Sequence, residues 1–138
     1  MSRDIISLVG EIRAEREADF RRLLEELCGR ALAVALFGSR ARGDNTPLSD
    51  WDLLAVVESG EYRIESTSIG QILWLPLDRI EEVLGWSMII LDALADAKLL
   101  CGDRVILEKA REKALEYIRE KRLIRTRAGW IPSYNPHS

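Results

Sequence analysis

The sequence predicts an α+β fold in which helices pack on a small mixed β-sheet. Continuous apolar runs that are too short for helices and are bounded by turn residues indicate buried strands. Longer segments with apolar residues three and four positions apart indicate helices before and after these runs. At 138 residues the chain can bury one hydrophobic core, so we predict a single domain over residues 1–128 and a loose tail over 129–138.

The N-terminal half is predicted to hold a long helix and two strands. Apolar residues recur at helical spacing over residues 1–29, and a glycine at the end of that range suits a left-handed cap. The runs ALAVALF (31–37) and LLAVV (53–57) are expected to be buried strands. Between them, residues 39–42 have room for little more than one helical turn.

The C-terminal half is predicted to add a third strand and further helices. The run QILWLPL (71–77) has the character of a strand closed by proline. Asp78 is placed to cap a short helix, with Glu81 as its capping-box partner. Two more helices are expected over 88–97 and about 103–124.

Charge is distributed unevenly along the chain. The net charge is −3, yet residues 109–127 hold eight basic and three acidic side chains. Such a run on a helix is usually a solvated face, and the alternative is a surface for a nucleotide, RNA or an acidic partner. No apolar run approaches the length of a membrane span, and charges precede any secretory core, so we expect a cytoplasmic protein without membrane contact.

Cys28 and Cys101 are the two cysteines. They lack metal-ligand spacing and have no histidine nearby, so we expect buried free thiols in preference to a zinc site or a disulfide.

We place the central part of the domain, which carries the functional motif, over residues 31–100. The motif consists of a Gly-Ser pair and two aspartates. Asp50 and Asp52 are separated by one residue, so on a strand both side chains point to the same face and Trp51 points to the other. Two adjacent carboxylates repel each other when ionised, and a divalent cation relieves that repulsion. Magnesium fits best, since it uses one or two protein carboxylates and completes its shell with water and substrate phosphates.

The Gly-Ser pair supplies the other half of this prediction. Gly38 at the end of a strand allows close approach of backbone to a phosphate, and Ser39 adds a hydroxyl donor. Arg40 and Arg42 bring cations within the same turn. Each feature alone has a common structural explanation, such as a strand-to-helix turn or an exposed arginine. Together they predict a site for a metal-bound nucleoside triphosphate.

The segment GSRARGDNTPLSDWDLL, with ten residues between Gly38-Ser39 and Asp50-Trp51-Asp52, resembles the signature of the minimal nucleotidyltransferases of the DNA polymerase beta superfamily. This resemblance implies transfer of a nucleoside monophosphate, usually AMP from ATP, to a hydroxyl of a protein or RNA, with two Mg²⁺ ions. By position, Gly38 and Ser39 would hold the triphosphate, while Asp50 and Asp52 would be the catalytic metal ligands.

The resemblance also bears on partners. Many such proteins are antitoxins paired with a HEPN-type ribonuclease toxin, so a partner of that kind is expected. The basic helix and Trp130 could form the docking surface for that partner, and the alternative is that they pack on the sheet of this chain. RNA is a less favoured partner, because most of the chain is acidic and no aromatic stacking pattern is present. The sequence leaves oligomerisation open.

One departure from the family pattern concerns catalysis. Active members carry a third carboxylate on the following strand, where this chain has Leu73 or Trp74. The alternative function is therefore a weakly active or inactive module that binds a nucleotide or a partner.

Overall fold

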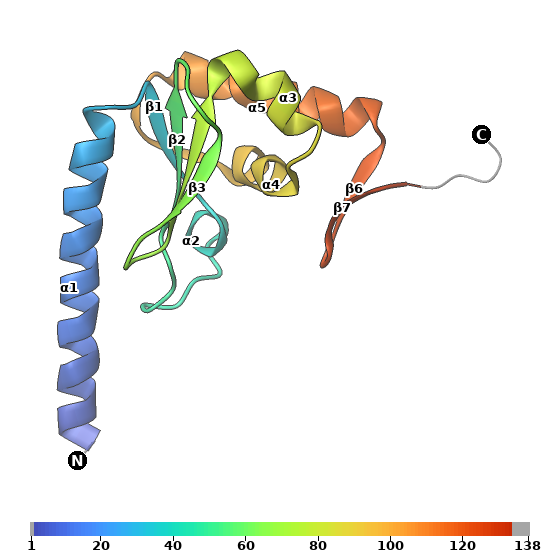
Figure 1. The fold of residues 1–138 in the computed structure, drawn as a ribbon. Coiled ribbons are helices and arrows are strands. Elements are labelled where there is room, and N and C mark those ends of the chain that lie inside the picture. Colours follow the sequence, from blue (N-terminus) through green and yellow to red (C-terminus); the bar gives the residue numbers. More distant parts are fainter. Residues whose placement is uncertain (1, 134–138) are drawn as a thin grey trace.

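The computed structural model describes residues 2–133 and contains a five-stranded mixed sheet with helices on both faces, which confirms the predicted fold class (Figure 1). The long first helix, the strands at the motif and the turn between them form as predicted. The elements in chain order are α1 (Ser2–Cys28), β1 (Ala33–Phe37), α2 (Ser39–Arg42), β2 (Asp52–Val57), β3 (Arg63–Ser66), β4 (Gln71–Pro76), η1 (Leu77–Arg79), α3 (Ile80–Leu84), α4 (Met88–Asp96), β5 (Lys98–Gly102), α5 (Arg104–Glu120), β6 (Leu123–Thr126) and β7 (Gly129–Pro132).

The sheet has the strand order β3-β4-β2-β1-β5. Strands β2 and β4 run parallel, whereas β1 is antiparallel to both β2 and β5. In the β1–β2 ladder Phe37 pairs with Asp52. The C-terminal end of β1 and the N-terminal end of β2 therefore meet, and the two halves of the sequence motif lie side by side at this end of the central strands.

Helices cover both faces of the sheet. Alternate strand residues such as Val34 and Leu53 pack with Leu27 of α1 on one face. Their neighbours, such as Ala35 and Leu54, pack in the core that α3, α4 and α5 complete on the other face. Burial on both faces explains why the central strands are continuous apolar runs without polar alternation. Among residues 2–133, no helix is both long and apolar enough to cross a bilayer.

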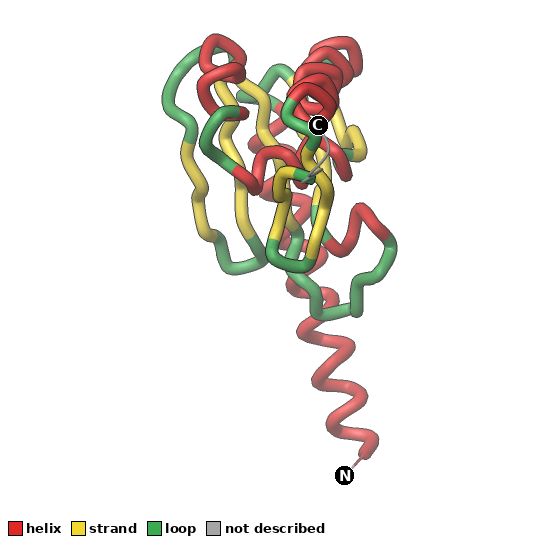
Figure 2. Tube along the Cα trace, turned by 90° about the vertical axis from the view of Figure 1, so that its right-hand side faces the viewer, coloured by secondary structure: helices red, strands yellow, loops and turns green. Residues whose placement is uncertain are grey.

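Helix α1 contacts the sheet with its C-terminal half. Its N-terminal half extends away from the body, past the edge of the sheet at which α2 lies (Figures 1 and 2). Ile5, Ile6 and Leu8 on that half are exposed.

Strands β3 and β5 were not predicted. β3 reads RIES and lies in a turn-rich segment, and its side chains are mostly exposed because it forms an edge of the sheet. β5 begins two positions after the last residue of α4, so no turn residue separates the two elements in the sequence. Its apolar residues therefore look like a continuation of the helix. Both are edge strands, where apolar patterning is weakest.

The C-terminal region differs from its prediction. Helix α5 ends at Glu120 instead of near residue 124, and β6 and β7 form a hairpin where residues 129–132 were expected to begin a loose tail. Trp130 is half-buried and packs against the main core. The rest of the predicted tail, residues 134–138, lies outside the described residues.

The predicted cap at Asp78 is wrong. Asp78 lies inside the 3₁₀ turn η1, and the position before α3 is Arg79, which makes no capping hydrogen bond through its side chain. Proline at 76 ends β4 one residue earlier than expected and shifts the turn. Asp103 is a true cap, since its carboxylate accepts hydrogen bonds from the backbone N–H groups of Val105 and Ile106.

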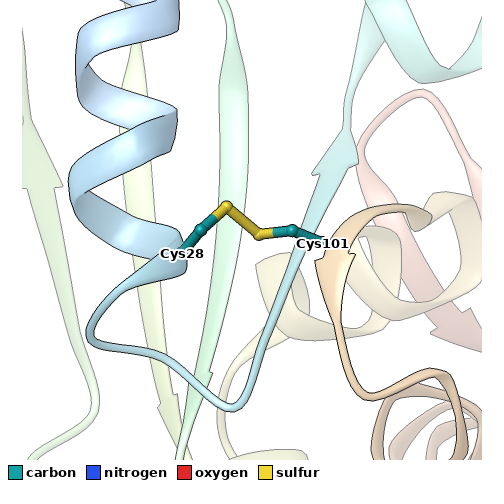
Figure 3. The surroundings of a disulfide bond; sticks show 2 residues. All are labelled: Cys28 and Cys101. Atoms are coloured by element: carbon teal, nitrogen blue, oxygen red, sulfur yellow. A yellow bond between two sulfur atoms is a disulfide. The ribbon is translucent and has the colours of Figure 1, made fainter.

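The two cysteines form a disulfide, which corrects the prediction of free thiols (Figure 3). Cys28 ends α1 and Cys101 lies on β5, 73 positions later in the sequence, with Cα atoms 6.1 Å apart. The sequence could not reveal this proximity, because it arises from β5 pairing with β1 beneath the end of α1. The disulfide fixes α1 to the edge of the sheet.

Removal of this disulfide should destabilise the protein substantially. Cross-links that close a loop of this length restrict the unfolded chain and stabilise by about 4 kcal/mol. We expect the double variant Cys28→Ala, Cys101→Ala to lose roughly that free energy of unfolding in urea titrations. Reduced wild-type protein should match the variant. Equal stability of oxidised and reduced protein would contradict the prediction.

Candidate active site

A cleft of about 450 Å³ lies at the end of the central strands where β1 ends and β2 begins. Residues of the motif form one side, and β4 and α4 contribute the rest. The lining residues are Phe37, Gly38, Ser39, Arg42, Ser49, Asp50, Asp52, Gln71, Ile89 and Asp92. The structure thus brings five of the six predicted site residues to one cleft.

Gly38 connects β1 to α2 with a backbone that favours glycine, at φ 77°. A Cβ atom built at this position would lie 2.5 Å from Oδ2 of Asp52 and would collide with it. Glycine therefore serves two purposes, because it permits the turn and it leaves room for the carboxylate. Ser39 follows directly as the first residue of α2.

Asp52 is the first residue of β2 and is half-buried. Its pKa is raised above the usual aspartate value, mainly because burial disfavours the charged form, and the nearby charge of Asp50 adds to this effect. The backbone N–H of Gln71 and the charge of Arg42 act in the opposite direction. A carboxylate whose charge is disfavoured by burial and by a second carboxylate is stabilised by a bound cation.

Asp50 is more exposed and is contacted by a residue that sequence reasoning missed. Arg16 of α1 lies 3.4 Å from Oδ1 of Asp50 and donates to the carbonyl oxygens of Ser49 and Ile69 at 3.2 and 3.4 Å. A single arginine thus links α1 to two loops at the cleft. The available signal was its position, since Arg16 interrupts the apolar stripe of α1.

Arg40 is turned toward the 47–51 loop instead of the cleft. Its guanidinium donates to the carbonyl oxygens of Pro47 and Ser49 and lies 3.7 Å from the centre of the Trp51 ring. Trp51 in turn stacks on Phe20 of α1, with ring centres 3.9 Å apart. Trp51 therefore lies on the α1 side of the sheet, whereas Asp50 and Asp52 both line the cleft, although only Asp52 belongs to β2.

The strand expected to carry a third carboxylate places Gln71 at the cleft. In the parallel ladder Leu53 pairs with Ile72, so Gln71 lies beside Asp52. Leu73 is buried in the core below the cleft, and Trp74 packs on the α1 side. A glutamine can orient a ligand by hydrogen bonds, but it takes no proton at neutral pH and binds Mg²⁺ more weakly than a carboxylate.

Asp92 was also missed, and it lines the cleft from α4. Its carboxylate accepts a hydrogen bond from Nε1 of Trp130 at 2.7 Å and lies 2.9 Å from Nη2 of Arg125. Its sequence context gave no signal, because an aspartate on an otherwise apolar helix is typical of an exposed position.

The donor atoms at the cleft suit one magnesium ion. Asp50 and Asp52 offer carboxylate oxygens, and the missing side chain at Gly38 leaves the Asp52 carboxylate open to a ligand on that side. Within residues 2–133, no group of three or more His, Cys, Asp or Glu side chains is arranged as a metal site. Water and substrate phosphates would therefore complete the shell, which is the usual mode for Mg²⁺.

Comparison with known families identifies the class of protein. The nucleotidyltransferase domain family matches residues 20–127, which covers most of the chain and all of the cleft. The chain belongs to this family.

Comparisons with individual proteins add less. No curated protein matches the chain. A solved structure described as "Crystal structure of the toxin-antitoxin with AMP-PNP" is similar at 14% sequence identity with a TM-score of 0.48, over 75% of this chain and 87% of that chain.

Substitution of Gly38 by alanine should disrupt the cleft. The new methyl group would collide with the Asp52 carboxylate on a backbone that already disfavours alanine. We expect Gly38→Ala to lower the free energy of unfolding by about 1–3 kcal/mol and to weaken metal-dependent nucleotide binding, as measured by calorimetric titration.

Gly43→Ala is the matched control for this prediction. Gly43 also has a positive φ, at 83°, but a Cβ atom there has no neighbour within 4 Å. It should lose comparable stability and retain nucleotide binding. If both variants bind nucleotide equally well, contact between Gly38 and Asp52 has no role in the site.

The raised pKa of Asp52 predicts how stability depends on pH. A carboxyl with a higher pKa in the folded state destabilises the fold as it ionises, so this penalty is absent at low pH and develops as the pH rises through the folded-state pKa. With divalent cations chelated, Asp52→Asn should melt at a higher temperature than wild type at pH 7, and this gain should vanish below about pH 4. A variant that melts lower than wild type at pH 7 would contradict the assigned cause.

Proposed function

We propose that this protein transfers a nucleoside monophosphate, with ATP as donor, to a hydroxyl group of a protein or RNA. The observation that carries the proposal is the meeting of Asp50 and Asp52 with Gly38 and Ser39 in one cleft, in a chain of the nucleotidyltransferase domain family. Neither half of the motif would suffice alone, since the reaction needs both a bound triphosphate and a bound metal.

Each residue of the sequence motif has a role in this proposal. The backbone at Gly38, the hydroxyl of Ser39 and the guanidinium of Arg42 hold the phosphates, and Asp50 and Asp52 hold magnesium. Magnesium, when bound, supplies charge neutralisation and alignment of the phosphate that is attacked. Arg40 contributes indirectly by fixing the 47–51 loop on which Asp50 lies.

Binding without turnover is the second candidate function. The observation that favours it is that β4 presents the amide of Gln71 beside Asp52, whereas Leu73 and Trp74, the positions matched to the third carboxylate, do not line the cleft. The cleft then lacks a basic group on β4 to accept the proton of the attacking hydroxyl. The fold would retain nucleotide or partner binding and lose most of its catalytic rate.

Two measurements separate the candidates. Titration with a nonhydrolysable ATP analogue, with and without Mg²⁺, should show magnesium-dependent binding that Asp50→Asn abolishes. Incubation with α-labelled ATP and acceptor-containing lysate should then label an acceptor and release pyrophosphate, and Asp52→Asn should reduce this labelling by at least about a hundredfold. Asp78→Asn is the control, because it removes an exposed carboxylate from η1, outside the cleft.

The outcomes distinguish the functions directly. Labelling that is unchanged in Asp52→Asn would refute the role assigned to Asp52. Magnesium-dependent binding without pyrophosphate release would favour the binding module. Absence of nucleotide binding under all conditions would reject the transferase and would leave only partner binding as the second candidate.

A protein partner of the HEPN toxin class is part of the proposal, and it rests on resemblance to the minimal nucleotidyltransferases. The half-buried Trp130 is engaged with Asp92, which favours packing over docking for this residue. Co-expression with a HEPN-type ribonuclease encoded by a neighbouring reading frame tests the pairing. A stable complex and relief of toxicity would support it, and toxicity that persists without complex formation would oppose it.

A further inference from the structure

Helix α4 lines one side of the cleft with Ile89 and Asp92, and the β6–β7 hairpin is held to α4 by hydrogen bonds. Asp92 and Asp96 lie one turn apart on α4 and share one cation of the hairpin. Arg125 donates from Nη1 and Nη2 to the two carboxylate oxygens of Asp96 at 3.0 and 2.8 Å, and its Nη2 lies 2.9 Å from Asp92. Trp130, which pairs with Arg125 across the hairpin, donates to Asp92. Arg125 and Trp130, which face each other across the hairpin, therefore hold the hairpin to α4.

Asp96 extends this contact to the motif. Nη1 of Arg42 donates to Oδ2 of Asp96 at 3.0 Å, so the carboxylate lies between the guanidinium of the cleft and that of the hairpin. The Asp96 side chain is 10% exposed. Its pKa is lowered, first by the hydrogen bonds from Arg125 and then by that from Arg42, so it is fully ionised at neutral pH.

We propose that Asp96 is a positioning residue that holds Arg42 at the cleft for the phosphates of the nucleotide, and that Arg125 holds Asp96, so that the β6–β7 hairpin is part of the nucleotide site. This inference rests on the proposed function. It assigns a role to a region of the chain that the family motif does not include.

The chemistry of Arg42 supports this role. Arg42 is the last residue of the short helix α2, and its side chain is 43% exposed. An arginine free in solvent would lose much rotamer entropy on gripping a phosphate, whereas one already held loses less. Asp96 and Asp44 together engage only two of its nitrogens, Nη1 and Nε, which leaves further N–H donors for a phosphate.

A double-mutant cycle on nucleotide binding tests the link between Asp96 and Arg42. The probe is a nonhydrolysable ATP analogue with Mg²⁺, and the chain is used in full. Asp96→Asn should weaken its binding about tenfold in the wild-type background and should have little further effect in Arg42→Gln. Additive losses would overturn the inference. Tighter binding by Asp96→Asn would also overturn it, because Asp96 would then neutralise Arg42 instead of positioning it.

The hairpin is tested with a charge-matched pair. Arg125→Gln should weaken binding of the analogue in the same way as Asp96→Asn. Arg127→Gln removes a charge from the turn of the same hairpin and should leave affinity within about twofold of wild type, since the bonds to Asp96 and Asp92 come from Arg125 and not from Arg127. Equal losses in the two variants would show a general effect of charge and would overturn the role of the hairpin.

Metal binding without nucleotide separates positioning from loss of structure. Mn²⁺ titration without nucleotide should give unchanged metal affinity in Asp96→Asn and Arg125→Gln, because Asp50 and Asp52 are untouched. Loss of metal binding in these variants would mean general damage to the cleft and would overturn positioning. If wild-type protein binds no analogue, the proposed function itself fails. If wild type binds and the cycle is additive, only the positioning role fails.

Discussion

Antiparallel pairing of β1 with β2 is the interaction on which the site depends. In this ladder Phe37 stands opposite Asp52, so the glycine that follows β1 meets the first carboxylate of β2. The chain between the two strands comprises α2 and a loop that Arg40 and Arg16 hold through the carbonyl oxygen of Ser49.

The central strands and the motif were predictable, because both depend on local patterns. Burial on two faces produces continuous apolar runs, and alternation along a strand separates Trp51 from its two aspartate neighbours. The edge strand β5 escaped prediction because its partner β1 is distant in the sequence. Strand β3 and the hairpin escaped prediction because many of their side chains are exposed and polar, so they lack a continuous apolar run. Cys28 and Cys101 illustrate the same limit, because their proximity depends on the pairing of β5 with β1.

The site combines opposing electrostatic demands. Asp52 is half-buried beside another carboxylate, which disfavours its charge, while Asp96 is held between two guanidinium groups, which favours its charge. The negative charge of Asp52 therefore lacks full compensation without a cation, whereas the negative charge of Asp96 is compensated by arginines of the protein. A ligand that brings both a metal and phosphates meets an electrostatically prepared surface on each side. At neutral pH the charge of Asp52 destabilises the folded state, and the charge of Asp96 stabilises it.

The disulfide closes a covalent ring from Cys28 to Cys101, and every cleft-lining residue lies inside that ring. The chain is thus a loop with two tails, one formed by α1 and the other by α5 and the hairpin. A peptide bond broken within the ring, for example at the exposed turn of Ser59 and Gly60, would separate neither fragment from the other. While oxidised, the protein would remain one covalent molecule after such a cut, with both walls of the cleft still attached.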